Sequence, residues 1–184
     1  DSYFTVTEGA NSYRVLGGTK GANFQPTSPV AVSARRAICE EILTAEIASA
    51  GAHEFITKTY VLSIVAVESS YNPRAASHSP AMGISQFVGP TAQSMGILDY
   101  WNYADELKGC VKYCDLCLRN SLHLRDRNKV IIYGAMRYNR GHGATDTDCL
   151  TAAETNEYGK KFVNFYNRLR TTYNPSIPEL VYTV

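Results

Sequence analysis

The chain has 184 residues, of which 45% are hydrophobic and 19% charged, and its formal net charge is +1. These values are those of an ordinary globular protein, and so small a charge provides no field for attracting nucleic acid or an anionic membrane surface. Its apolar runs are shorter than the roughly 20 residues that a membrane-spanning helix needs. The chain begins at Asp1 and not at a methionine, so we expect a processed form or a piece of a longer protein.

The first 32 residues show no periodic apolar pattern beyond a short strand-like tail. They are rich in Gly, Pro, Ser, Thr and Asn, a composition that is typical of loops. We therefore predict an irregular arm or linker over residues 1–32 and a folded domain over residues 33–184.

Helical periodicity dominates the remainder of the chain, and we expect an all-α domain without internal repeats. Several expected helices have a start or stop signal beside them, such as the capping residues Ser33 and Thr57 or the helix-ending Gly51. A stretch rich in Pro, Ser, Ala and Gly at 73–90 predicts a structured loop with a short helix. The helices are expected over residues 34–50, between Thr57 and Asn72, from about Thr91, and over residues 105–122, 128–138 and 151–170.

The last of these helices carries two specific expectations. Thr151-Ala-Ala-Glu154 has the form of a capping box, which predicts that the helix begins there. The apolar stripe that turns toward the core is expected to consist of Tyr158, Phe162, Phe165 and Leu169.

Three of the five cysteines share a helical face with apolar residues. These positions are Leu107, Cys110, Val111, Cys114, Cys117 and Leu118. Such a stripe indicates core packing, in which a free cysteine acts as a small hydrophobic residue, or a disulfide. A zinc site is the alternative, with Cys149, His123 or His142 as a fourth ligand, but no paired C-x-x-C motif supports it. We therefore predict no metal and no cofactor.

A nearly apolar helical run ends in the carboxylate of Glu68. Because Val61, Ile64 and Val65 precede it at helical spacing, the carboxyl shares their face. Asn72-Pro73 ends the helix, so Glu68 lies close to the negative end of the helix dipole. Apolar neighbours and this dipole both disfavour the ionised form, and we expect a raised pKa. A glutamate at the edge of the core, paired with an arginine, is the alternative interpretation.

Three patches of sequence follow one another in order. They read Glu68-Ser-Ser-Tyr-Asn-Pro-Arg-Ala-Ala-Ser77, then Pro80-Ala-Met-Gly-Ile-Ser-Gln86 with Pro90-Thr-Ala92, then Ala135-Met-Arg-Tyr-Asn-Arg-Gly141. Together they resemble the catalytic domain of the soluble-type lytic transglycosylases, whose patterns are E-S-x-(F/Y)-(D/N)-P-x-A-x-S, G-A-x-G-L-x-Q with P-x-T-A, and A-Y-N-x-G. The resemblance covers about residues 33–172 and implies the lysozyme-like fold that this family shares with goose-type lysozyme, so the catalytic domain is expected over residues 33–184.

The resemblance also implies roles for individual residues. Glu68 matches the family's single catalytic acid and base, and Tyr138 matches the tyrosine whose hydroxyl lies beside that carboxyl. Glycan-binding roles are implied for Ser77, Gln86, Asn139, Glu154 and Tyr158. Glu154 has a second interpretation as the capping-box glutamate described above.

Five positions depart from the family pattern. Pro80 stands where glycine is usual and Ser85 where a larger apolar residue is common, and Pro90 is shifted by one place. Arg137 and Arg140 replace small residues on either side of the Tyr-Asn pair. These departures concern the shape of the groove and not the acid.

The implied reaction is cleavage of the MurNAc-β-1,4-GlcNAc bond of peptidoglycan with formation of 1,6-anhydromuramyl ends. Such a cleavage needs a carboxyl that is protonated near neutral pH. Most glycosidases add a second carboxylate, but none accompanies Glu68 in the matched motifs, and the substrate's own N-acetyl oxygen can take its place. We expect peptidoglycan glycan strands as the partner and a monomer that acts at the bacterial cell wall, in the periplasm or, if the source is a phage, as a lysin or virion-associated enzyme.

Three other functions remain open at this point. A hydrolytic muramidase on the same fold would need a carboxylate that holds water, for which Asp99, Asp105 and Glu154 are candidates. A murein peptide endopeptidase would need a Cys–His pair or zinc, and the chain has no H-E-x-x-H motif. A sugar-binding module without catalysis is the third.

Overall fold

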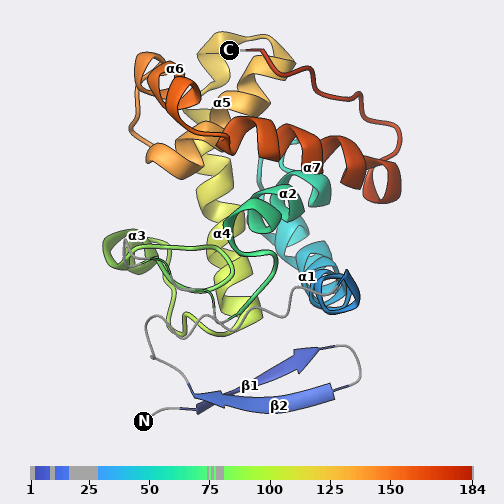
Figure 1. Ribbon diagram of the computed structural model, residues 1–184. Coiled ribbons are helices and arrows are strands. Elements are labelled where there is room, and N and C mark those ends of the chain that lie inside the picture. The colour runs from blue at the N-terminus through green and yellow to red at the C-terminus, as the bar shows by residue number, and fades with distance from the viewer. Residues whose placement is uncertain are drawn as a thin grey trace. The chain divides into compact units, whose positions relative to one another are not determined.

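The computed structural model describes residues 3–8, 11–16, 29–73, 75, 77 and 81–183. Near the N-terminus, strands β1 (Tyr3–Glu8) and β2 (Asn11–Leu16) pair antiparallel over their whole length (Figure 1). The prediction of an irregular arm is wrong for these residues. Both segments are rich in the β-branched and aromatic residues that suit strands, and the surrounding glycines and prolines obscured this signal. The expected linker at 17–28 lies outside the described residues.

Helices account for most of the described chain and confirm the predicted class (Figure 1). Their bounds are α1 (Pro29–Ala50), α2 (Lys58–Ser69), α3 (Gly89–Ser94), α4 (Tyr103–Arg119), the 3-10 helix η1 (Leu122–Leu124), α5 (Arg127–Arg140), α6 (Asp146–Thr155) and α7 (Tyr158–Tyr173). In the loop before α3, Met82 and Phe87 form an isolated antiparallel bridge. None of the helices in the described part of the chain combines the length and the apolar character that crossing a membrane requires.

Two of the three predicted boundary residues of α1 and α2 lie at the ends of these helices. The hydroxyl of Thr57 accepts from the backbone N–H of Tyr60 at 3.2 Å, as expected of a cap for α2. Gly51 follows α1 with a φ of +61°, which confirms it as the stop. The predicted start at Ser33 is wrong, because α1 already begins at Pro29. Proline suits a first helical turn, where its missing N–H would have had no partner in the helix.

The predicted helix over residues 151–170 is in fact two helices. The capping box is formed by Thr145 and Asp148, each of which accepts from the other's backbone N–H, at 2.9 and 3.0 Å. Glu154 is therefore an exposed residue in the last turn of α6, and its capping-box interpretation is wrong. Asn156 has an extended backbone, which ends α6. In α7 the fully buried Tyr166 takes the place expected for Phe165, which is partly exposed.

The chain divides into two units, residues 1–49 with 68–110 and residues 50–67 with 111–184. The predicted division into an arm and a catalytic domain stays a prediction. In the first unit the buried apolar residues include Cys39, Leu43, Ile84, Phe87 and Leu107. In the second they include Leu62, Ile131 and the ring pair Tyr60 and Phe162, whose centroids lie 5.2 Å apart in an edge-on arrangement.

All five cysteines are buried and none forms a disulfide. Cys110, Cys114 and Cys117 lie along α4 with fully buried side chains, which confirms the prediction of a core stripe. Burial raises the pKa of the Cys39 thiol, and the neighbouring Cys110 adds to this rise. The stripe therefore consists of buried side chains that pack as small apolar groups.

Removing one thiol from this stripe should leave a small cavity. We expect Cys114→Ala to lower the free energy of unfolding by about 1 kcal/mol, the central value for point substitutions, as measured by urea denaturation. Lys112→Ala, an exposed change on the same helix, serves as the control and should stay within about 0.5 kcal/mol. Stoichiometric zinc in the purified protein, together with unfolding on chelation, would contradict the packing role.

Candidate active site

Glu68 is the next-to-last residue of α2. The helix that leads to it is buried, since Val61, Ile64 and Val65 have no exposed surface, whereas Glu68 itself is partly exposed. The carboxyl thus stands where an apolar helix reaches the surface. Its predicted place in the last turn of the helix is confirmed.

The backbone turns sharply directly after this carboxyl. Ser70 and Tyr71 have φ values of 52° and 63°, which non-glycine residues seldom adopt. Two side chains hold the turn through its carbonyl groups. The buried Arg35 of α1 donates to the Ser70 oxygen at 3.0 Å, and the Tyr103 hydroxyl donates to the Tyr71 oxygen at 3.5 Å. The strained backbone is therefore fixed by contacts from α1 and α4, as strain at a functional site requires.

Gln86 lies in a loop that is bonded to the end of α2. The hydroxyl of Ser69 donates to the Ile84 carbonyl oxygen at 2.7 Å, so the residue beside Glu68 holds this loop. The Gln86 amide nitrogen donates to the carbonyl oxygens of Ala75 and Gly83 at 3.1 and 2.9 Å. These two bonds use both hydrogens of the amide, so the side chain offers a ligand its carbonyl oxygen as an acceptor.

Ser77 belongs to the same set of linked turns. Its backbone N–H donates to the Ala81 oxygen at 2.9 Å, and its hydroxyl accepts from the Ala81 N–H at 3.2 Å. The side chain is partly exposed. The first unit thus joins the segments of three predicted site residues, Glu68, Ser77 and Gln86, through a short series of hydrogen bonds, most of them between a side chain and the backbone.

Sequence reasoning missed Glu106, a fully buried carboxyl beneath the Gln86 loop. Its Oε1 accepts from the Ser85 N–H at 3.2 Å, and its backbone oxygen accepts from the Ser85 hydroxyl at 3.2 Å. A signal was present, because Glu106 precedes Cys110 by four residues and so shares the face of the cysteine stripe. The unusual serine at position 85 is explained as its partner.

In the second unit, Tyr138 occupies the last turn of α5 and is 7% exposed. Its ring meets that of Tyr113 edge-on, with centroids 5.1 Å apart. The Tyr113 hydroxyl accepts from the His142 N–H at 3.0 Å, and burial raises the pKa of Tyr113 to about 12. His142, once a candidate zinc ligand, thus belongs to the loop contacts that hold the end of α5.

The other predicted residues of this unit differ in exposure. The Asn139 side-chain oxygen accepts from the Asn156 amide at 3.5 Å, and the Asn156 side chain in turn accepts from the Tyr158 N–H at 3.1 Å. Asn156 therefore links the end of α5 to the start of α7. Asn139 and Glu154 are exposed, whereas Tyr158 is buried.

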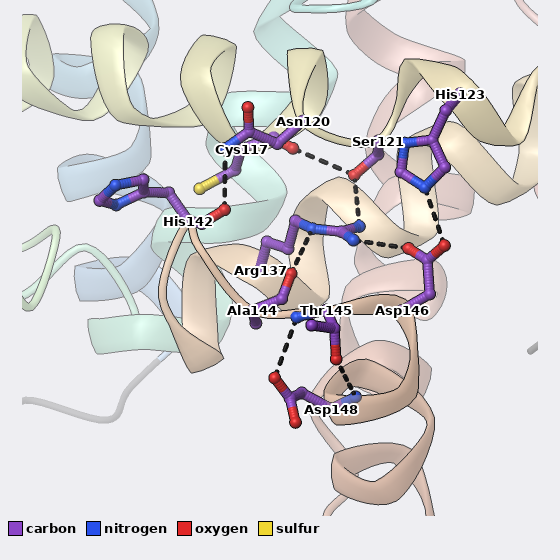
Figure 2. A network of polar contacts seen from close by, with 10 residues as sticks. All are labelled: Cys117, Asn120, Ser121, His123, Arg137, His142, Ala144, Thr145, Asp146 and Asp148. Carbon is purple, nitrogen blue, oxygen red and sulfur yellow. Dashed lines mark hydrogen bonds and ion pairs between the residues drawn. The ribbon is translucent and has the colours of Figure 1, made fainter.

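Arg137 organises the connection between α5 and α6 (Figure 2). Its guanidinium is 3% exposed and donates to the Ser121 hydroxyl at 2.8 Å, the Ala144 oxygen at 3.0 Å and Asp146 Oδ1 at 2.5 Å. The other oxygen of Asp146 pairs with His123 Nε2 at 2.8 Å (Figure 2). The hydrogen bond from Arg137 holds the pKa of the Asp146 carboxyl below its usual range. An arginine in place of the family's small residue thus fixes the loop that follows Tyr138 and Asn139.

Of the two aspartates considered for a hydrolytic mechanism, Asp99 lies between α3 and α4 and Asp105 in the first turn of α4. Asp105 Oδ2 accepts from the backbone N–H groups of Leu98 and Asp99 at 2.6 and 2.7 Å. Asp99 Oδ1 accepts from the Trp101 N–H at 2.9 Å. Both carboxylates therefore hold the loop that leads into α4.

Comparison with protein families gives a match to the transglycosylase SLT domain over residues 46–159. This segment is more than half of the chain and contains every residue predicted for the site. A search among curated proteins gave no match. The chain therefore belongs to the SLT transglycosylase family and is a lytic transglycosylase that cleaves glycosidic bonds in peptidoglycan.

Proposed function

We propose that Glu68 is the single acid and base of this enzyme and that the bond cleaved is MurNAc-β-1,4-GlcNAc. The observation that carries the proposal is the placement of a partly exposed carboxyl at the end of a buried helix, followed by a turn that Arg35 fixes and Ser69 ties to the loop of Gln86. A carboxyl that must exchange protons with a substrate needs both access to the surface and a rigid backbone.

The reaction can be written with this one carboxyl. Protonated Glu68 gives its proton to the glycosidic oxygen as the bond from C1 of the muramyl residue to that oxygen breaks. The substrate's N-acetyl oxygen stabilises the positive charge at C1. The Glu68 carboxylate then takes the proton of the C6 hydroxyl, and the C6 oxygen bonds to C1. The carboxyl is regenerated, no water is consumed, and the product is a 1,6-anhydromuramyl end.

The hydrogen bonds of the Gln86 side chain indicate which of its atoms would contact the substrate. Since its amide nitrogen is committed to Ala75 and Gly83, its side-chain oxygen is the atom offered to a ligand. An N-acetyl sugar carries an amide N–H, which is a matching donor. We propose that Gln86 binds this N–H and that Ser77 lines the same subsite. A fixed acceptor that aligns the acetamido group would also align the acetyl oxygen needed in the reaction.

In the second unit the proposed roles follow the family motif. Tyr138 would tune the protonation of the acid through its hydroxyl, and Asn139 and Glu154 would bind the glycan. The exposure of Asn139 and Glu154 suits contact with a ligand. Tyr158 is buried and its backbone N–H is bonded to Asn156, so we assign it the positioning of that segment.

The alternatives are less well supported. Asp99 and Asp105 already accept backbone hydrogen bonds within their own loop, which favours a structural role over holding a catalytic water. A cysteine endopeptidase needs a thiolate with a lowered pKa, whereas burial raises the pKa of Cys39 and Cys149. The monomeric state and action from a virion stay predictions.

Replacement of the acid gives the first test of this mechanism. Glu68→Gln keeps the volume of the side chain and removes the exchangeable proton, so we expect normal folding and a loss of peptidoglycan cleavage of at least about 10²–10⁴-fold. Glu41→Gln, an exposed change on α1, is the control and should retain full activity.

Mass spectrometry of the muropeptides released by the wild type decides between reaction types. Anhydromuramyl ends are lighter by one water than the reducing ends that hydrolysis leaves. Anhydro ends are the expected product. Reducing ends alone would identify a hydrolytic muramidase, and intact glycan strands with cut peptides would identify an endopeptidase.

Loss of the Gln86 side chain should affect binding more than protonation. We expect Gln86→Ala to raise KM while the pH dependence of kcat keeps its shape, because an acceptor is lost and the proton donor is retained. Gln93→Ala, an exposed change on α3, serves as the matched control. A lower kcat with unchanged KM would argue against the binding role.

Loss of the Tyr138 hydroxyl should have the opposite signature. A hydroxyl close to a carboxyl shifts its pKa, so we expect Tyr138→Phe to displace the pH profile of kcat. Tyr173→Phe, at the end of α7, provides a tyrosine control. Superimposable profiles for wild type and Tyr138→Phe would exclude a tuning role.

A further inference from the structure

Glu106 is a buried carboxyl of the first unit that the proposed reaction does not use. It lies on α4 with no exposed surface, and it contacts the Gln86 loop from two directions. The carboxyl accepts from the Ser85 N–H, and the backbone carbonyl of the same residue accepts from the Ser85 hydroxyl. One residue of α4 therefore holds the position directly before Gln86 at two points.

The loop passes directly over this carboxyl. Gly83 has a φ of +80°, and a methyl group added to it would lie 2.1 Å from Glu106 Oε1 and 2.2 Å from the Tyr100 carbonyl oxygen. No side chain fits in that space, so the backbone of Gly83 packs against the carboxyl. Gln86 in turn has a φ of 55° and donates to the Gly83 oxygen. The conformation of Gln86 thus depends on the segment that Glu106 supports.

We propose that Glu106 is a positioning residue for Gln86: with Ser85 it fixes the loop Gly83–Gln86, and so sets the affinity of the N-acetyl sugar subsite. The proposal rests on the binding role of Gln86 proposed above. Glu106 acts through the loop and does not touch the substrate, so the quantity that it controls is KM and not the chemical step.

The surroundings of Glu106 favour the neutral carboxyl. Burial raises its pKa well above the usual range, the hydrogen bond from Ser85 opposes this rise, and Cys110, Asp105 and Asp99 add to it. These three nearby titratable groups are all acidic, and among the described residues Oε2 has no hydrogen-bond partner. Ionisation would therefore place an uncompensated negative charge directly beneath the loop.

The sign of the resulting pH dependence follows from the direction of this shift. The folded protein retains a proton that the unfolded chain releases near the ordinary value of 4.5. Stability therefore falls as the pH rises above that value, until the folded carboxyl also ionises. The fraction of molecules with an intact loop decreases at higher pH, once the pH passes the folded pKa. KM should then rise by up to about tenfold per pH unit, since apparent affinity scales with the competent fraction.

Glu106→Gln tests the proposal, because glutamine keeps the shape and an oxygen acceptor for Ser85 but cannot ionise. For the wild type we expect an alkaline rise in KM that is absent from Glu106→Gln, with similar kcat values. Amide hydrogen exchange of residues 81–87 gives a second readout that needs no activity. The protection of this segment, which is the intrinsic base-catalysed rate relative to its observed exchange rate, should fall at alkaline pH in the wild type and not in the variant. Glu157→Gln, an exposed change outside this unit, should behave as the wild type.

Two further variants separate positioning from general stability. In a Gln86→Ala background, Glu106→Gln should no longer alter the pH dependence of KM. Glu106→Leu removes the acceptor and should speed exchange of residues 81–87 at every pH. Equal pH profiles of KM and of exchange in wild type and Glu106→Gln would overturn the proposal. If the wild type released no anhydro products but lost protection of this loop at alkaline pH, and Glu106→Gln did not, the proposed reaction would be refuted and the positioning role supported.

Discussion

The hydrogen bond from Arg35 to the Ser70 carbonyl oxygen supports the whole of the first unit's site. Two successive residues after Glu68 have left-handed backbones, and such a pair costs on the order of 1–3 kcal/mol per residue unless neighbouring contacts enforce it. Arg35 comes from α1 and has almost no exposed surface. Because this turn is held in place, the Ser69 hydroxyl can donate to the Ile84 carbonyl oxygen. This hydrogen bond fixes the loop of Gln86 to the end of α2.

A similar arrangement recurs at two of the positions where the chain departs from its family's pattern. At position 137 an arginine takes the place of a small residue, and its guanidinium reaches Ser121, Ala144 and Asp146. At position 85 a serine takes the place of a larger apolar residue, and both of its polar groups bond to Glu106. A buried polar group is costly unless it is paired. Each of these two residues therefore has bonding partners, and each set of contacts fixes one loop beside a predicted site residue.

The sequence predicted the structure best where one local pattern pointed to a helix boundary and no similar pattern lay nearby. The apolar spacing of α2, the cap at Thr57 and the stop at Gly51 could all be inferred from a few neighbouring residues. The two helices α6 and α7 could not, because Thr145–Asp148 and Thr151–Glu154 offer similar capping patterns and only tertiary packing decides between them. The β1–β2 pair was obscured by loop-forming composition. The partners of Arg137 and Glu106 depend on contacts between distant residues, which no periodicity contains.

Glu68 and Glu106 illustrate how environment gives one residue type two tasks. The first stands at the end of a buried helix with partial exposure, which suits the release and recovery of a proton in the role proposed for it. The second lies fully inside, where burial and then its acidic neighbours raise the pKa of its carboxyl, so this environment favours the neutral, hydrogen-bonding form. Environments that push two carboxyl pKa values apart are a general means of separating roles in glycosidases. In the roles proposed here, the Glu68 carboxyl would take part in the reaction, whereas the Glu106 carboxyl would hold the loop of the sugar subsite in place as long as it stays neutral.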